Sequence, residues 1–306
     1  MANNPCYVLP MVWIRVALLS ALIIASTCLH VVPILLVTLV KLVLPVQRLK
    51  VACNPLLTGF AESWIGVNNW LWGTFTDTRL TLDGDLDLQR DGHYLVLANH
   101  QSWVDILVLQ KAFNRRIPFL RFFLKRQLFW VPLLGLAWWA LDFPFMGRYT
   151  PKQVAKNPAL ARRDIESTRR ACEKFRAIPV SIMNFVEGTR FAQAKHQRQS
   201  SPYRHLLKPK SGGVAFVLDA MGQGLQAIID VSIAYPAGIP SLVDLMANRV
   251  PEVRVQVRQR LIPADLAGGD YQNDRAFRAR FQQWMNGLWV EKDADLGRML
   301  GRTDGE

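Results

Sequence analysis

The longest uninterrupted apolar stretch of the chain runs from Val16 to Val40, 25 residues without a charged side chain. A helix of about 20 apolar residues crosses the hydrocarbon core of a bilayer, so this stretch predicts a membrane-embedded helix. No polar face appears at any helical angle, which disfavours a buried helix of a water-soluble domain. Pro33 divides the stretch, so a bent hairpin that enters one leaflet remains open beside a single span.

The charges around this stretch bear on its orientation. Only Arg15 precedes it and no small-residue cleavage site follows, which disfavours a cleaved signal peptide. Lys41, Arg48 and Lys50 come after it. For a single span, this excess of basic residues predicts that the remainder of the chain lies in the cytoplasm, as in a protein of the bacterial inner membrane.

After residue 78 the pattern changes to short apolar runs separated by segments of helical periodicity. Strands are expected at Tyr94–Ala98, Val180–Val186, Ala227–Ala234 and Val253–Leu261, and helices at Trp103–Phe113, Ala159–Arg176, Val214–Met221 and Arg275–Val290. This alternation predicts a single α/β domain with a mostly parallel or mixed sheet flanked by helices. The turn residues Asp83-Gly84-Asp85, between the alternating segments Leu80–Leu82 and Leu86–Leu88, predict a β-hairpin.

Two parts of the chain are expected: membrane-anchoring helices in residues 1–72 and a catalytic domain in residues 73–306. Val51–Gly73 predicts a connecting helix on the membrane surface. Leu128–Leu141 is too short to span a bilayer, and predicts either an interfacial or acyl-chain-lining helix or a core helix of the domain. The interfacial alternative is anchored by Arg121, Lys125 and Arg126, and the last helix is also typical of a surface helix, with arginines beside Phe277, Phe281, Trp284 and Trp289.

Composition narrows the possible partners. The 37 basic and 24 acidic residues give a net charge of +13, which indicates a polyanionic partner. The 50% hydrophobic content and 10 tryptophans favour a membrane over nucleic acid, for which no binding motif is present. The four cysteines lie far apart, so no metal site is expected.

The segment Asn99-His100-Gln101-Ser102-Trp103-Val104-Asp105 carries the first candidate chemistry. Histidine is the side chain best suited to take a proton from an alcohol at neutral pH, and a carboxylate can hold it in one tautomer. Residues i and i+5 diverge on a helix, but His100 is expected in the turn between a strand and a helix that begins near Ser102, where it can fold back toward Asp105. A surface hydrogen bond is the alternative.

The second candidate is Phe185-Val186-Glu187-Gly188-Thr189-Arg190, at the end of another expected strand. A glycine permits close approach of the backbone, while a hydroxyl and a guanidinium suit an anion. Further on, Lys210 precedes Ser211-Gly212-Gly213 at the expected start of a helix, a second possible phosphate seat. An ordinary solvated loop is the alternative for both segments.

Together these segments resemble the glycerophospholipid acyltransferase family, whose best-known members are 1-acylglycerol-3-phosphate acyltransferases. Its N-H-x-x-x-x-D and F-x-E-G-T-R blocks are both present, in the family's order. Phe143–Arg148 and Val231–Pro236 are similar to two weaker blocks of the family, although Gly147 stands where Asp, Asn or His is common. The resemblance covers roughly Thr81 to Pro263.

The resemblance implies transfer of a fatty acyl group from a thioester to the free hydroxyl of a lysophospholipid, foremost 1-acylglycerol 3-phosphate. His100 would be the general base and Asp105 would orient it. The residues implied to bind the acceptor or donor are Arg148, Glu187, Gly188, Thr189, Arg190 and Lys210. No cofactor is expected, because acyl-CoA or acyl-carrier protein is itself the donor substrate.

Two alternatives remain open at this stage. The acceptor could be another lysophospholipid, such as lysophosphatidylglycerol or a lysocardiolipin, since each has a phosphate. The chain could also be a membrane scaffold that binds anionic lipid without chemistry, although such a scaffold does not require His100 and Asp105. No G-x-S-x-G sequence is present, which disfavours a serine lipase.

Overall fold

The computed structural model describes residues 5–44, 46–147, 149, 156–157, 159–176 and 178–301. Its α-helices are α1 (Pro5–Val43), α2 (Gln47–Phe75), α3 (Val104–Phe113), α4 (Leu134–Ala140), α6 (Ala159–Phe175), α7 (Gln193–Gln199), α8 (Ser211–Met221), α9 (Leu242–Met246) and α10 (Arg275–Met299). Its strands are β1 (Arg79–Gly84), β2 (His93–Ala98), β3 (Leu120–Phe122), β4 (Leu124–Lys125), β5 (Phe145–Met146), β6 (Val180–Phe185), β7 (Ala227–Ala234) and β8 (Glu252–Arg260). Short 3₁₀ helices are η1 (Arg126–Trp130), η2 (Gly222–Gly224) and η3 (Ala264–Leu266).

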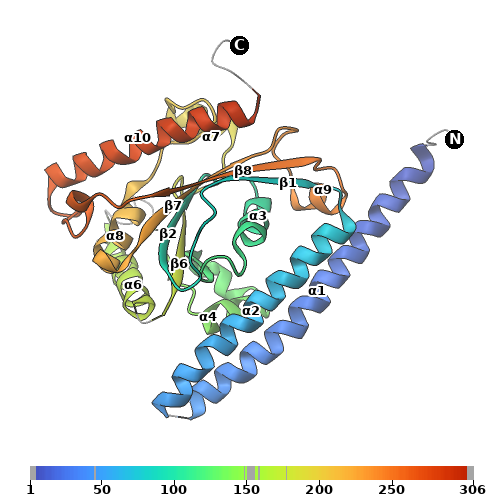
Figure 1. The fold of residues 1–306 in the computed structure, drawn as a ribbon, viewed down its shortest axis with the longest axis horizontal. Helices are drawn as coiled ribbons and strands as arrows, with labels where there is room; N and C mark the ends of the chain where they lie inside the picture. The colour runs from blue at the N-terminus through green and yellow to red at the C-terminus, as the bar shows by residue number, and fades with distance from the viewer. Residues whose placement is uncertain are drawn as a thin grey trace.

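A six-stranded sheet with the order β1-β8-β7-β2-β6-β3 forms the centre of the domain (Figure 1). β2 lies parallel to both β6 and β7, β3 lies parallel to β6, and only the β7–β8 pair is antiparallel. The α/β fold with a mostly parallel sheet flanked by helices is therefore confirmed. Because β2, β6 and β7 point the same way, the loops that follow them gather at one edge of the sheet, where open α/β sheets place their ligands.

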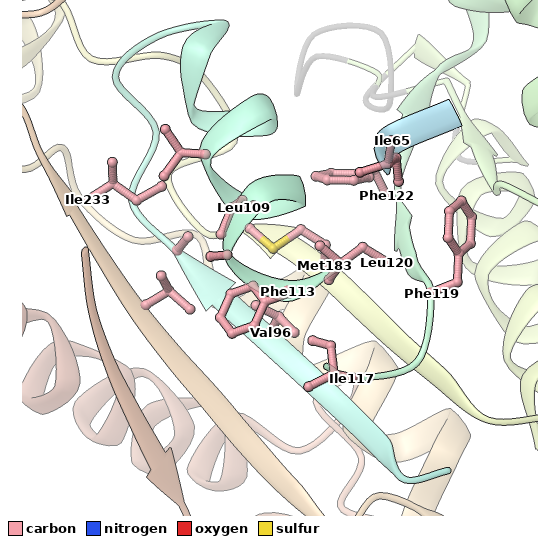
Figure 2. Packing of buried hydrophobic residues seen from close by; sticks show 14 of the residues in the cluster. Ile65, Val96, Leu109, Phe113, Ile117, Phe119, Leu120, Phe122, Met183 and Ile233 are labelled. Atoms are coloured by element: carbon pink, nitrogen blue, oxygen red, sulfur yellow. The ribbon is translucent and has the colours of Figure 1, made fainter. Parts of the chain in front are cut away.

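Apolar side chains from alternate positions of the strands enter two separate cores. On one face α2, α3 and the segment that includes β3 cover Tyr94, Val96 and Ala98 of β2. Figure 2 shows Leu109 and Phe113 of α3 over this face of the sheet. On the other face α6, α8 and α10 cover Leu95 and Leu97. A strand covered on both faces is apolar throughout, which is why β2 reads as a continuous apolar run.

The first two helices form a long hairpin along one side of the domain (Figure 1). The segment Met11–Val43 of α1 is long and apolar enough to cross a membrane by length and composition. The bent-hairpin alternative at Pro33 is wrong, because α1 continues through the proline and the chain reverses after Val43 instead. The second helix is also more than a surface connection, since Leu57 and Ile65 of α2 belong to the domain core.

Three further expectations are wrong in detail. No β-hairpin forms at Gly84 in this described part of the chain: β1 pairs in parallel with β8. Leu128–Leu141 is not one helix, but is divided into η1 and α4 around Pro132. Arg121 does not anchor this segment at an interface, because its buried guanidinium donates to the carbonyl of Leu141 and lies between Phe119 and Phe175.

The last helix lies at the outside of the domain, as expected, but one of its faces is buried in the core. Phe281 and Trp289 are fully buried between α10 and the sheet. The helix also continues nine residues beyond Val290, and Lys292 and Asp295 of this extension are themselves buried, Lys292 against Asp230 and Asp295 against Arg258. The Nζ atom of Lys292 lies 2.5 Å from the carboxylate of Asp230 on β7. A sequence pattern that treats charged residues as solvent-facing cannot anticipate this extension.

Candidate active site

His100 lies in the turn that leads from β2 into α3. Its Nδ1 atom is 2.8 Å from Oδ2 of Asp105, on the first turn of α3. The reversal of the backbone between Asn99 and Trp103 brings two residues five positions apart into contact, as expected from the strand-to-helix transition. Since Asp105 accepts the Nδ1 proton, the Nε2 atom carries the lone pair of the neutral imidazole.

Asp105 is completely buried, and four donors surround its carboxylate. Oδ2 accepts from His100 and from the backbone N–H groups of Gln101 at 2.6 Å and Ser102 at 2.8 Å. Oδ1 accepts from the hydroxyl of Tyr235 at 2.6 Å. A buried carboxylate is tolerated only when donors replace its water, and these four do so.

The ring and backbone of His100 are both fixed. The imidazole stacks on Phe185 with ring centroids 3.9 Å apart and planes 13° from parallel. The main-chain N–H of His100 donates to Glu187, and its carbonyl accepts from the N–H of Phe191. Its side chain is 15% exposed, and no hydrogen bond to Nε2 is made by the described residues. This nitrogen is therefore available to a reacting group.

Glu187 is buried, and its two oxygens bind the backbone of two different loops. Oε1 accepts from the N–H of His100 at 2.9 Å, and Oε2 accepts from the N–H of Leu207 at 3.0 Å. Burial raises the pKa of Glu187 to about 7, against the smaller opposing effect of these two bonds. The geometry gives Glu187 a role in holding His100, whereas the expected contact with an acceptor remains a prediction.

The loop after β6 contains Gly188, Thr189 and Arg190, and the side chain of Lys210 lies against it. Gly188 has φ of +67°, and a Cβ atom there would lie 3.1 Å from the side chain of Lys210. The ammonium of Lys195 donates to the Thr189 hydroxyl and the Arg190 carbonyl, at 2.7 and 2.9 Å. The guanidinium of Arg190 lies 4.9 Å from the Trp103 ring. These cations border the His100 turn and suit an anionic ligand.

The structure thus brings together His100, Asp105, Glu187 and the Gly188–Arg190 loop, whereas Arg148 lies outside the described residues. Lys210 reaches this loop through its side chain and through its N–H, which donates to the Val186 carbonyl. Ser211 is the first residue of α8 and does not cap it: its hydroxyl contacts Tyr271 and Gln282, and Lys210 holds the N-cap position.

Sequence reasoning assigned no role to Tyr235, to Asn99 or to Lys195. The Asn99 amide exchanges two 2.9 Å hydrogen bonds with the backbone of Ile233. Tyr235 and Ile233 belong to the Val231–Pro236 segment, which was noted only as similar to a weaker block of the family. The contact depends on β7 lying beside β2, and strand order is not readable from the local pattern.

The protein thus has a mixed α/β fold. A His–Asp pair suited to acid–base chemistry lies at the carboxyl end of a parallel strand, beside a cationic loop. The sequence model of the Acyltransferase family matches residues 79–236, just over half of the chain. The chain belongs to this family.

The chain is similar to several proteins that are named as acyltransferases. The chain is 27% identical over 206 residues to 1-acyl-sn-glycerol-3-phosphate acyltransferase epsilon of Mus musculus, covering 59% of this chain and 53% of that protein. It is 24% identical over 245 residues to 1-acyl-sn-glycerol-3-phosphate acyltransferase 3 of Arabidopsis thaliana, covering 74% and 60%. Identity to lysocardiolipin acyltransferase 1 of Mus musculus is 25% over 251 residues, covering 76% and 61%. The chain thus spans about 53% to 61% of the length of these relatives.

A solved structure has the same fold. The 1-acyl-sn-glycerophosphate acyltransferase PlsC from Thermotoga maritima superposes with a TM-score of 0.52 at 15% identity. The match covers 92% of this chain and 98% of the PlsC chain, so it includes the helical hairpin as well as the domain.

Proposed function

We propose that this protein is a membrane-bound acyltransferase that moves a fatty acyl group from an acyl thioester to the free hydroxyl of 1-acylglycerol 3-phosphate. The observation that carries the proposal is the buried Asp105 carboxylate on Nδ1 of His100, which leaves Nε2 as a free acceptor. The names of the related acyltransferases support the substrate class.

In the proposed reaction, Nε2 of His100 takes the proton of the acceptor hydroxyl as its oxygen attacks the thioester carbonyl. The tetrahedral intermediate then expels the thiolate, and the imidazolium returns the proton to that sulfur. Asp105 stabilises the imidazolium between these two steps, as the carboxylate of a catalytic triad does. No acyl-enzyme forms and the donor, acyl-CoA or acyl-carrier protein, is consumed as a substrate.

The acceptor phosphate is assigned to the loop after β6. Arg190 and Lys210 supply positive charge, and Thr189 supplies a hydroxyl beside the ammonium of Lys195. The absence of a Cβ atom at Gly188 lets the Lys210 side chain lie close against this loop. Arg148 stays a candidate for a further phosphate or donor contact.

The location follows from the substrates. Both acceptor and product are amphiphiles, so a site away from the bilayer would have to extract an acyl chain at about 0.8 kcal/mol per methylene. The apolar helix α1 would hold the domain at the membrane. We propose a bacterial inner membrane, with the catalytic domain on the cytoplasmic side because basic residues follow α1.

Lysocardiolipin is the second candidate acceptor, supported by the similarity to lysocardiolipin acyltransferases. The test is an acyl-transfer assay on membranes that contain the protein, with lysophosphatidic acid, lysophosphatidylglycerol and lysocardiolipin offered in parallel. Each acceptor is paired with acyl-CoA and with acyl-carrier protein. Highest kcat/KM with lysophosphatidic acid supports the proposal, and a preference for lysocardiolipin favours the second candidate. No transfer to any acceptor would overturn both.

A further inference from the structure

Tyr235 lies directly after β7, at the edge of the sheet where the His100 turn follows β2. The two strands are neighbours, so the tyrosine reaches Asp105 across 130 residues of sequence. Its side chain is buried, and its hydroxyl donates to Oδ1 of Asp105 at 2.6 Å. The proposed reaction gives this hydroxyl no role.

The two oxygens of Asp105 are used unequally. Oδ2 accepts from His100 and two backbone N–H groups, whereas Oδ1 accepts from Tyr235 alone among the described residues. Burial and the negative charge of Asp105 raise the pKa of Tyr235 well above its ordinary value. The hydroxyl is therefore a proton donor at every physiological pH, and the direction of this hydrogen bond does not change.

We propose that Tyr235 is a positioning residue that sets the basicity of His100 through Asp105. A donor on Oδ1 withdraws charge from the carboxylate and holds its plane in line with Nδ1 of His100. With the Tyr235 hydroxyl in place, Asp105 stabilises the imidazolium less. Nε2 of His100 then stays unprotonated down to a lower pH than it would without this hydroxyl. Without the donor, the imidazolium is stabilised further and the base is blocked until a higher pH.

The other charged groups near this pair are few. Glu187, after β6, faces the backbone N–H of His100, and Arg190 lies over Trp103 at the start of α3. Lys195 and Lys210 lie against the loop after β6. The next charged residue of α3 is Lys111, which lies against Trp72 at the far end of the helix. The segment from Pro236 to Ser241, which contacts Ser102, has no titratable side chain. Tyr235 is thus the group through which β7 acts on Asp105.

The decisive test does not require enzyme turnover. Diethylpyrocarbonate reacts with imidazole only in its unprotonated form. The rate at which the His100 peptide is carbethoxylated, followed by mass spectrometry against pH, therefore reports the basicity of His100. Tyr235→Phe keeps the ring and removes the donor. We expect the midpoint for His100 to rise by about half a pH unit, a roughly threefold loss of reactive imidazole below the midpoint.

Tyr94→Phe is the matched control. Tyr94 is also buried, lies at the opposite end of β2 and accepts a hydrogen bond from the N–H of Gln89 at 3.0 Å. The control should leave the His100 midpoint where it is in the wild-type protein. An unchanged midpoint in Tyr235→Phe, or the same rise in both variants, would overturn the inference.

Two further variants exclude a purely structural effect. In an Asp105→Asn background, Tyr235→Phe should cause no additional shift, because the path between the two residues is already broken; an additive shift contradicts the inference. Replacement of Tyr235 by 3-fluorotyrosine makes the hydroxyl a stronger donor and should lower the midpoint. The 3-fluorotyrosine protein also tests the role of Tyr235 if the phenylalanine variant does not fold. An unchanged or higher pH midpoint for His100 modification in this protein contradicts the inference.

The catalytic readout rests on the proposed function. The acid limb of the kcat/KM profile of Tyr235→Phe should move to higher pH by the same amount as the modification midpoint, with the acceptor and donor KM values unchanged. A raised acceptor KM with an unmoved acid limb would instead make Tyr235 a binding residue. If the wild-type protein acylates no lysophospholipid, the proposed function fails while the modification experiment still decides the role of Tyr235.

Discussion

The imidazole of His100 is prepared before any substrate arrives, because one nitrogen is engaged by Asp105 and the ring is held against Phe185. In the proposed reaction, such preorganisation would remove the need to reorient the base. Three predictions concern single side chains of this site.

The first prediction is that His100→Ala loses transfer activity by about 10²–10⁴-fold, the usual contribution of a general base. Membrane attachment should stay as in the wild-type protein, and the variant should stay folded because the N–H groups of Gln101 and Ser102 and the Tyr235 hydroxyl still donate to Asp105. His93→Ala is the control, since His93 lies at the other end of β2. Wild-type turnover by the His100 variant would exclude the base mechanism.

The second prediction separates acceptor from donor binding. Arg190→Ala should raise the acceptor KM about 10- to 100-fold and the donor KM much less, because a lost charge-assisted hydrogen bond costs about 1.5–3 kcal/mol. Arg190→Lys should recover only part of the loss, since lysine cannot bind a phosphate through two parallel bonds. Arg198→Ala, exposed on α7, is the control. A rise confined to the donor KM would move Arg190 to the donor site.

The third prediction concerns the pH dependence of stability. The pKa of Glu187 rises from 4.5 to about 7 on folding, so its contribution is fully present below pH 4.5 and is lost as pH rises through 7. Glu187→Gln cannot titrate, and should gain about 2 kcal/mol relative to wild type between pH 5 and pH 7. Urea unfolding in detergent at both pH values measures this difference. A constant difference between the two proteins would show that the carboxyl does not titrate in this range.

At the scale of elements, Asn99 joins the end of β2 to β7 where the two strands have ceased to pair. Its amide satisfies both the N–H and the carbonyl of Ile233. Asn99→Ala leaves two buried backbone groups unpaired, and should lower the free energy of unfolding by about 1–3 kcal/mol for each. Gln101→Ala in the same turn is the control. Equal stability of the two variants in urea unfolding would contradict this role.

The elements themselves show what the sequence could predict. The runs that became β2, β6 and β7 were predicted because a strand buried on both faces has few polar residues. The strand β8 is different, because its buried valines alternate with polar residues. The hairpin at Gly84 failed because alternation identifies a strand but not its partner, and the partner of β1 lies 173 residues away. The same reasoning explains the site: His100 and Asp105 meet within one local turn, whereas Tyr235 meets them only through strand order.

At the scale of the whole molecule, α1 keeps most of its apolar surface exposed although it packs against α2. Apolar burial is not screened by salt, so the full chain should stay in the membrane pellet after washing in about 1 M salt, where the Debye length is about 3 Å. Release by salt alone would show that the helix is not inserted.

Charged substitutions on the exposed apolar surface of α1 test the same anchoring role. Leu29 and Leu36 are 72% and 58% exposed on α1. Leu29→Asp combined with Leu36→Asp should shift the protein toward the soluble fraction and lower its activity on vesicles. Leu261→Asp, 88% exposed after β8, is the control and should change neither. Equal partitioning of both proteins would exclude α1 as the anchor.

The pairing of β1 with β8 also constrains the order of events during synthesis. The α1–α2 hairpin and β1 leave the ribosome first, but among the described residues the strand that pairs with β1 is β8, residues 252–260. Until then its N–H and carbonyl groups form an open edge, which is a template for mispairing with other chains. Early capture of the hairpin by the membrane would keep nascent chains apart during this interval. A chain that stops before Glu252 should therefore aggregate, even though it contains every residue of the His100 turn.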